Sequence, residues 1–166
     1  MTENILARLI EHNNWATLQI FDVCATLTAA QLDFEPQSAV RGTIRETLRH
    51  LVLSQEDYTA MLTTFDHPPE REVMPTLVEL REIVVQSGRE LVALVQDFSS
   101  KSLQSQIQVS DGYRVEPWVF IVQAINHATE HREQIKSILS ALGVEPPRID
   151  GWMYGRLENA LIPPGS

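Results

Sequence analysis

Cysteine, long apolar runs and an N-terminal targeting pattern are all lacking or scarce in this 166-residue sequence. Cys24 is its single cysteine, so an internal disulfide is excluded, and we expect a reducing, cytoplasmic setting. No apolar run approaches the ~20 residues that a helix needs to cross a bilayer, so we expect no membrane segment. Because MTENILARLI has no basic start followed by an apolar core, we expect no signal peptide.

Positive charge is also scarce. The chain has 13 basic and 22 acidic residues, for a net charge of −9 at pH 7. A surface built to neutralise phosphates needs the opposite balance, so we expect no nucleic-acid partner. The sequence contains no G-x-S-x-G motif, phosphate-binding loop or dinucleotide fingerprint. Its 43% of hydrophobic residues can supply one stable core, so we expect residues 1–166 to form a single domain.

Apolar residues recur at helical spacing in four long segments, which predicts an all-α domain. The predicted helices span residues 3–27, 44–65, 76–98 and 117–142. Thr2 is the expected N-cap of the first helix, and Thr43 with Glu46 forms an expected capping box at the start of the second. The connection 28–42 is long enough to cross from one end of a bundle to the other, so successive helices need not be antiparallel.

The apolar stripes of these helices predict which residues face the core. On the first helix the stripe consists of Ile5, Leu9, Ala16, Ile20, Val23 and Leu27. On the second helix it consists of Ile44, Leu51, Tyr58, Met61, Leu62 and Phe65. Ser87 and Gly88 interrupt the third helix, and because glycine lowers helix propensity there, the pair indicates a close helix–helix approach.

A small β-hairpin is predicted before the last long helix. Asp111-Gly112 is a strong turn signal with alternating residues on both sides. We therefore expect Gln106–Val109 to pair with Tyr113–Glu116. An isolated ribbon of this size is marginally stable, so it should pack on the helices.

The C-terminal part is expected to hold one more short helix. Gly143 is the expected cap that ends the last long helix, and Asp150 is the expected N-cap of a helix over 151–161. Its apolar residues are expected to pack back on the domain: Trp152, Leu157 and Leu161.

The stretch INHATEHREQI, residues 125–135, carries the clearest chemical signal. His127 and His131 are four residues apart, which places them about 40° apart on one face of a helix. That face also carries apolar residues, so both rings are predicted to point inward, whereas Arg132 and Lys136 are predicted to point to solvent. Two imidazoles at this spacing can reach one metal ion.

His50 is the candidate third ligand, at the margin of the buried side of the second predicted helix. Metal sites in helical bundles are made from inward side chains on facing helices. Three imidazoles would leave coordination positions open, which is typical of a catalytic or substrate-binding site and not of a closed structural one. The spacing leaves an alternative open, in which the histidines are buried and satisfied by hydrogen bonds.

HATEH also matches the HxxEH pattern of inverted zinc proteases, in which Glu130 would be the catalytic base. Those enzymes take their third ligand from a distant downstream glutamate, and only residues 132–166 follow His131 here. Glu130 lies about 60° from His127, on the polar side of the helix. A solvated carboxylate, or one that acts behind the ligands, is therefore favoured, and we assign no catalytic residue.

Further residues are candidates for the wall of a pocket at this site. Ser54 and Tyr58 follow His50 along the second helix, and Gln134 lies near the histidine face, where it could orient a ligand. His12 lies at the edge of the first apolar stripe. Its alternative interpretation is a partly buried histidine satisfied by a neighbouring polar group.

Three segments together point to a known family. They are NNWAT in the first helix, RETLRHLVLSQEDY in the second and INHATEHREQIKSILSALGVEP in the last long helix. The third is the most specific, with H-x-x-x-H-R-x-Q-I followed by L-G-x-x-P. On these residues the chain resembles the DinB-like (DinB/YfiT) superfamily of small four-helix-bundle proteins over essentially its whole length.

The resemblance implies an up-down-down-up four-helix bundle and includes the hairpin before the fourth helix, to which the sequence pattern adds the short C-terminal helix. It implies a divalent ion, often zinc or nickel, held by the three histidines that match the family motif, His50, His127 and His131. It also implies a homodimer. Characterised relatives include thiol-dependent transferases and a thiol-dependent isomerase, so the resemblance implies a low-molecular-weight thiol as co-substrate of a small-molecule substrate.

These observations together predict a metal-dependent thiol S-transferase or hydrolase with an open tri-histidine site. The alternative is a non-enzymatic metal-binding or stress-response protein. Three imidazoles suit several metal ions, so the sequence names neither the metal nor the thiol nor the substrate.

Overall fold

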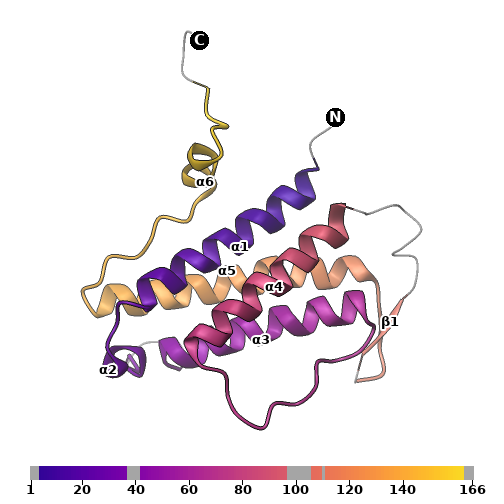
Figure 1. Cartoon of the computed structure of the whole chain (residues 1–166), viewed down its shortest axis with the longest axis horizontal. Helices are drawn as coiled ribbons and strands as arrows, with labels where there is room; N and C mark the ends of the chain where they lie inside the picture. Colours follow the sequence, from indigo (N-terminus) through magenta and orange to yellow (C-terminus); the bar gives the residue numbers. More distant parts are fainter. Residues whose placement is uncertain (1–3, 37–41, 97–105, 110, 163–166) are drawn as a thin grey trace.

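A computed structural model of the chain describes residues 4–36, 42–96, 106–109 and 111–162. This described part is mostly helical, with one antiparallel two-stranded ribbon (Figure 1). Its long helices are α1 (Ile5–Cys24), α3 (Ile44–Thr63), α4 (Leu77–Gln96) and α5 (Pro117–Ala141). The shorter elements are α2 (Ala29–Leu32), β1 (Ile107–Gln108), β2 (Arg114–Val115) and α6 (Gly151–Leu157). None of the described helices combines the length and apolar character needed to cross a membrane.

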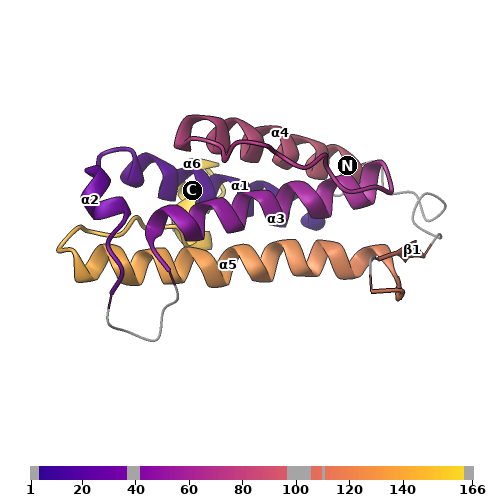
Figure 2. The same ribbon diagram turned by 90° about the horizontal axis from the view of Figure 1, so that it is seen from below.

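The four long helices pack side by side. α1 packs against α4 and α5, and α3 packs against the same two helices. Figure 1 shows α1 and α5 running in one direction and α3 and α4 in the opposite direction. The connection 64–76 leads from the end of α3 back along the molecule to the start of α4. Figure 2 shows α3 and α5 lying next to each other. This neighbouring pair carries the three candidate ligands.

Local sequence explains where α3 begins and where α5 ends. Thr43 Oγ1 accepts a hydrogen bond from the Glu46 N–H, and Glu46 Oε2 accepts one from the Thr43 N–H at 2.9 Å. This is the predicted capping box. Gly143 follows α5 with φ at +71°, a left-handed conformation that costs glycine little.

The first helix is shorter than predicted. Asn4 caps it by accepting hydrogen bonds from two backbone N–H groups of the first turn, whereas Thr2, the predicted cap, lies outside the described residues. The helix ends at Cys24 and not at residue 27. The N–H groups of Thr26 and Leu27 bond three residues back, so the chain tightens there and leaves the helix.

The close approach predicted at Ser87-Gly88 is confirmed. A Cβ added to Gly88 in α4 would lie 2.4 Å from Nδ2 of Asn14 in α1. Ser87 is also buried, and its hydroxyl accepts a hydrogen bond from Gln55 of α3 at 3.0 Å. Glycine at position 88 therefore lets α4 lie close to α1, where a larger residue would force the Asn14 side chain to move.

The predicted hairpin is present before α5. Ile107 lies opposite Val115, and Gln108 lies opposite Arg114, within the segments expected to pair. Ile107 is buried and packs with the apolar residues at that end of the helices. The ribbon is thus held by the helical body, as its small size requires.

Several apolar residues predicted to face the core are exposed. Ile5 and Leu9 are 71% and 47% exposed, because the buried face of α1 is rotated towards Ala7, Ile10 and Asn13. The buried face therefore includes polar positions, which a search for apolar spacing passes over. Phe65 is 58% exposed because α3 ends at Thr63, before it.

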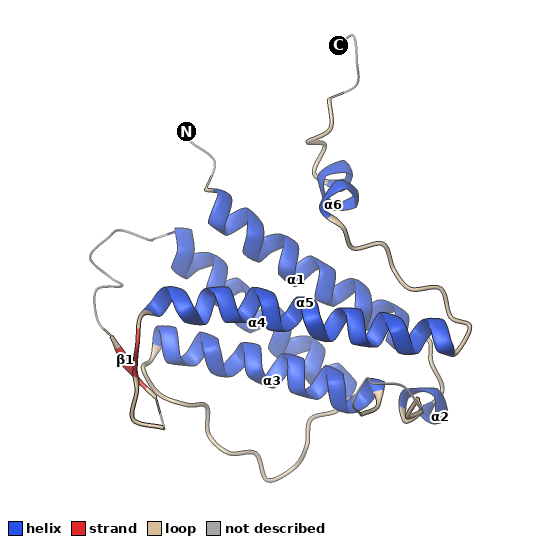
Figure 3. Cartoon of the chain, turned by 180° about the vertical axis from the view of Figure 1, so that it is seen from behind, coloured by secondary structure: helices blue, strands red, loops and turns tan. Residues whose placement is uncertain are grey.

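The C-terminal segment packs less tightly than predicted. Asp150 does cap α6, but the helix ends at Leu157 and not at residue 161. Figures 1 and 3 show α6 at the outer edge of the molecule, past α1. The predicted packing of its apolar residues is wrong, because Trp152, Leu157 and Leu161 are exposed. Tyr154 makes the contact with α1 in their place.

Candidate metal centre

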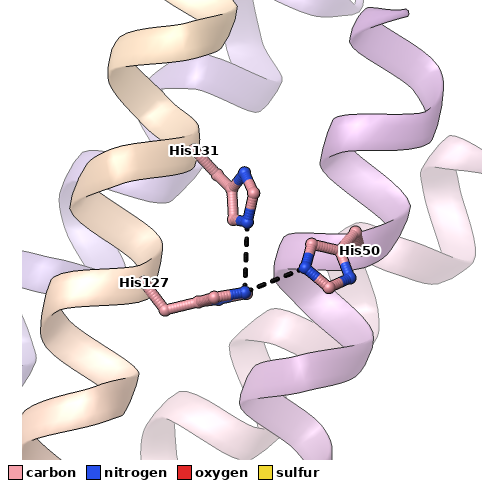
Figure 4. A group of neighbouring side chains, drawn as sticks. All are labelled: His50, His127 and His131. Atoms are coloured by element: carbon pink, nitrogen blue, oxygen red, sulfur yellow. Dashed lines mark hydrogen bonds between the residues drawn. The ribbon is translucent and has the colours of Figure 1, made fainter. Parts of the chain in front are cut away.

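The three predicted ligands meet across the interface between two packed helices. His50 projects from α3, and His127 and His131 project from successive turns of α5 (Figure 4). On α5 the fully buried line runs through Ala128 and Ile135, and the two histidines lie just beside it. They are therefore partly buried at the edge of the helix pair, and His50 is exposed. The site is thus reachable from solvent.

The ring nitrogens of the three histidines converge. Nε2 of His127 lies 3.0 Å from Nε2 of His50 and 3.1 Å from Nε2 of His131. One ligand atom from each residue lies within 4.8 Å of the others. Two nitrogens bound to one ion at about 2.05 Å would be roughly 2.9–3.4 Å apart for bond angles between about 90° and 110°. The two Nε2 separations at His127 therefore fit a shared divalent ion.

Hydrogen bonding alone does not account for both short contacts of His127. A ring nitrogen carries either a proton or a lone pair. Nε2 of His127 therefore cannot donate to one neighbour and accept from the other, so neutral rings must share either one proton or one lone pair between the two contacts, or leave one contact without a hydrogen bond. Three lone pairs directed at one cation remove this conflict, so the donor set fits a metal better than a chain of hydrogen bonds.

Gln134 sets the tautomer of one of these rings. Its Oε1 lies 2.7 Å from Nδ1 of His131, so Nδ1–H donates to this amide oxygen. The neutral ring then presents its lone pair at Nε2, the atom that faces His127. Such a hydrogen bond behind a ligand fixes the orientation of the ring. The structure thus places Gln134 where the sequence prediction put it.

The surroundings keep the rings of His127 and His50 neutral. Burial, with smaller contributions from the neighbouring His131 and His50, lowers the pKa of His127 to about 4. The pKa of His50 is also lowered, first by burial and then by His131. A histidine must be deprotonated to bind a metal. Both rings therefore offer free lone pairs at neutral pH.

A groove of about 480 Å³ runs along α3 beside the histidines, and we refer to it as the α3 groove. His50, Ser54 and Tyr58 line it, together with the charged residues Glu46, Arg49 and Asp57 and with Leu53. The Tyr58 ring also lies edge-on to His127, with 5.9 Å between ring centroids. Two of the predicted pocket residues are therefore brought next to the cluster, and both carry a hydroxyl group.

His12 lies elsewhere. Its Nε2–H donates to the carbonyl oxygen of Ile149 at 2.9 Å, and its ring contacts Trp15 and Tyr154. This geometry matches the alternative interpretation of a partly buried histidine with a polar partner, and it corrects the proposal of His12 as a pocket wall. The residue helps to hold the C-terminal segment on α1. Glu130 is exposed on α5, as a solvated carboxylate should be.

The prediction that Arg132 points to solvent is wrong, because its side chain is only 4% exposed. Its Nη1 donates to Asn13 Oδ1 at 2.8 Å, to the Asn13 carbonyl oxygen and to Thr17 Oγ1, and Nη2 donates to Thr129 Oγ1. Burial lowers its pKa to about 10. The burial of Arg132 could have been predicted from the other helix, where Asn13 and Thr17 are polar, lie four residues apart and face inward.

Comparisons with known proteins agree with this picture. The model of a family described as the DinB family matches residues 1–163. A search of curated proteins finds no match. Among solved structures, the chain is similar to the crystal structure of a DinB-like protein from Bacillus subtilis, with 13% sequence identity and a TM-score of 0.62. The match covers 86% of this chain and 98% of the other, and at this identity it supports the fold alone.

Proposed function

Because the chain belongs to the DinB family and directs three imidazoles at one point, we propose that it binds a divalent metal ion at an open tri-histidine site and acts as a metal-dependent thiol S-transferase or hydrolase. The observation that carries the proposal is the convergence of three Nε2 atoms with spacings of 3.0 and 3.1 Å at His127. Three protein ligands leave room for a further ligand, which a structural site with four protein ligands does not.

The residues of the site have distinct roles in this proposal. His50, His127 and His131 hold the ion, for which zinc and nickel are the proposed identities, and Gln134 orients His131 through Nδ1. When bound, the ion would lower the pKa of a water or thiol at its open side and so supply a nucleophile near neutral pH. Tyr58 places its phenol group in the adjoining groove, where it can orient a substrate by hydrogen bonding.

The family resemblance supplies the remaining parts of the proposal. The co-substrate is a low-molecular-weight thiol, the substrate is a small electrophile, and the reducing cytoplasm is the setting that keeps such thiols available. The fold is proposed to be the up-down-down-up four-helix bundle, in line with the helix directions in Figure 1. The functional unit is proposed to be a homodimer.

Metal analysis tests the first part of the proposal. Protein purified without chelator is expected to carry about one equivalent of a divalent metal per chain. Elemental analysis and native mass spectrometry measure this directly. Protein that has no metal and takes up neither zinc nor nickel on dialysis would rule the tri-histidine site out.

Turnover tests the second part. Metal-loaded protein is expected to couple a small thiol, such as cysteamine or N-acetylcysteine, to 1-chloro-2,4-dinitrobenzene, or to hydrolyse 4-nitrophenyl acetate. A chelator should abolish the reaction, and added zinc or nickel should restore it. Metal-loaded protein that is inert in all these assays would favour the second function.

That second function is a non-enzymatic metal-binding or stress-response protein, and one observation favours it. Both carboxylates of the α3 groove are engaged within the chain, Glu46 with the Thr43 N–H and Asp57 with His67. Among the described residues, the groove therefore has no free carboxylate to serve as a general base beside the histidines.

A further inference from the structure

The acidic side chains of the α3 groove have partners within the chain, whereas its one arginine has none within the described part of the chain. Its two carboxylates both have partners: Glu46 Oε2 accepts from the Thr43 N–H at 2.9 Å, and Asp57 Oδ1 lies 2.6 Å from Nδ1 of His67. Each partner lies outside the groove, in the segment before α3 or in the connection after it. The negative charges that line the groove are thus neutralised or held in place by the protein itself.

Arg49 is the charged residue of this groove whose partner is missing. It precedes His50 in α3 and lines the same groove. Its Nε is buried without a hydrogen-bond partner, and no ion pair joins Arg49 to any residue that the structure describes. Arg45 and Arg81, in contrast, form ion pairs with Asp33 and Asp22. A buried Nε–H without an acceptor is costly to keep unless a ligand supplies the acceptor.

We propose that Arg49 binds a carboxylate on the small molecule that reaches the tri-histidine site, so that the site selects acidic substrates or acidic thiols. The proposal rests on the proposed function, because it needs an open metal site beside the groove. The planar guanidinium can form two parallel hydrogen bonds to a carboxylate, which fixes the orientation of the ligand as well as its charge. A chain with a net charge of −9 repels anions in general, so a local unpaired cation is needed to admit one.

Two thiols of the same size test this selectivity. 3-Mercaptopropionate carries a carboxylate, and 3-mercaptopropanamide carries a neutral amide in the same place. Each is titrated into protein loaded with Co²⁺, and the change in the visible spectrum of the ion reports binding. The ratio of the two dissociation constants is compared between the wild type and Arg49→Gln. Differences in thiol acidity cancel in this comparison, because both proteins receive the same two thiols.

The wild type is expected to prefer the carboxylate thiol, and Arg49→Gln is expected to reduce that preference by about tenfold, the effect of one charge-assisted hydrogen-bond pair. Arg49→Lys should retain part of the preference, because it keeps the charge but loses the planar fork. Arg81→Gln on α4 is the matched control: it removes the same charge from an exposed pair with Asp22 and should leave the ratio unchanged.

The outcomes separate this proposal from the function on which it rests. Protein that binds no Co²⁺, or whose Co²⁺ spectrum responds to neither thiol, overturns the open metal site and this inference with it. A ratio that is equal in the wild type, Arg49→Gln and Arg81→Gln overturns the role of Arg49 alone and leaves the metal site standing. If Arg49→Gln does not fold, Arg49→Lys and the wild type still decide, because a wild type without preference contradicts the proposal.

Discussion

Two consecutive residues of α5, His131 and Arg132, face opposite environments. His131 lies at the open edge between α3 and α5, where its Nε2 points at another ring nitrogen and not at a donor or acceptor of the backbone. Arg132 points towards α1, where its guanidinium makes four hydrogen bonds and is shielded from solvent. On one side of the helix three ring nitrogens face one another, and on the other side the guanidinium has an acceptor on each terminal nitrogen.

The difference teaches how function and stability are divided within one helix. A buried polar group without a partner costs free energy, so the Arg132 side must be satisfied by the fold itself. The histidine side is close enough to solvent for an external ion to complete it. We therefore expect substitutions on the first side to affect stability, and substitutions on the second side to affect ligand binding.

The largest effect is expected from His127→Ala on metal affinity. His127 makes both of the short Nε2 contacts, so its loss should weaken zinc binding by roughly a thousandfold. That factor corresponds to one ligand's part of the total free energy of metal binding. Competition with a chromogenic chelator measures the affinity. The stability of the metal-free protein should change by no more than about 1 kcal/mol, since the ring is only partly buried. Unchanged metal affinity would contradict the assignment of ligand binding to the histidine side of α5.

The next effect is expected from Arg132→Met on stability. The change leaves the acceptors on Asn13 and Thr17 buried without a donor, so the free energy of unfolding should fall by about 2–4 kcal/mol. Urea denaturation measures it. Lys136→Met, one turn later on α5, is the matched control, because its pair with Glu133 lies near solvent and should contribute less than about 1 kcal/mol. Equal losses in the two variants would show that the Arg132 network is not stabilising.

A smaller effect is expected from Gln134→Leu. Without the amide oxygen, Nδ1–H of His131 loses its acceptor, and metal affinity should fall by about tenfold. The same chelator competition applies, with Gln123→Leu on the exposed side of α5 as control. A fall of equal size in both variants would point to a general effect on the helix and not to the orientation of His131.

A further effect is expected from pH. Burial, together with the neighbouring His131 and His50, lowers the pKa of His127 to about 4 in the folded chain, whereas the unfolded chain has the ordinary value near 6.5. Between these values the unfolded state takes up a proton that the folded state does not, so the metal-free protein should lose stability as the pH falls from about 6.5 to about 4. Denaturation at several pH values measures the slope. His127→Ala should have a shallower slope, and equal slopes would contradict the assignment.

Much of the helical framework could be predicted from the sequence because its signals are local. The Thr43–Glu46 capping box, the Gly143 cap and the Asp111-Gly112 turn act over three or four residues, and the structure shows each of them. The ends of α1 and α6 were less predictable. Whether a helix continues for one more turn there depends on tertiary contacts that end residues make or lack.

The faces of the helices were harder to predict where polar residues are buried. Apolar spacing assigned Ile5 and Leu9 to the core and Arg132 to solvent, and the structure reverses all three. The inner face of α1 carries Asn13 and Thr17, and Arg132 of α5 donates to the side-chain oxygen of each. A pattern within one helix cannot reveal a partner on another.

The sequence by itself determined the positions of the long helices, the pairing of His127 with His131 on one helix face and, through its motifs, the choice of His50 as a companion. Periodicity and capping act within a few residues, so they can be read without a fold. Only the tertiary structure decided that Nε2 of His50, 77 residues away, lies 3.0 Å from that of His127, and that Arg49 lines the groove beside them without a partner. Such contacts depend on how α3 packs on α5, which no single segment specifies.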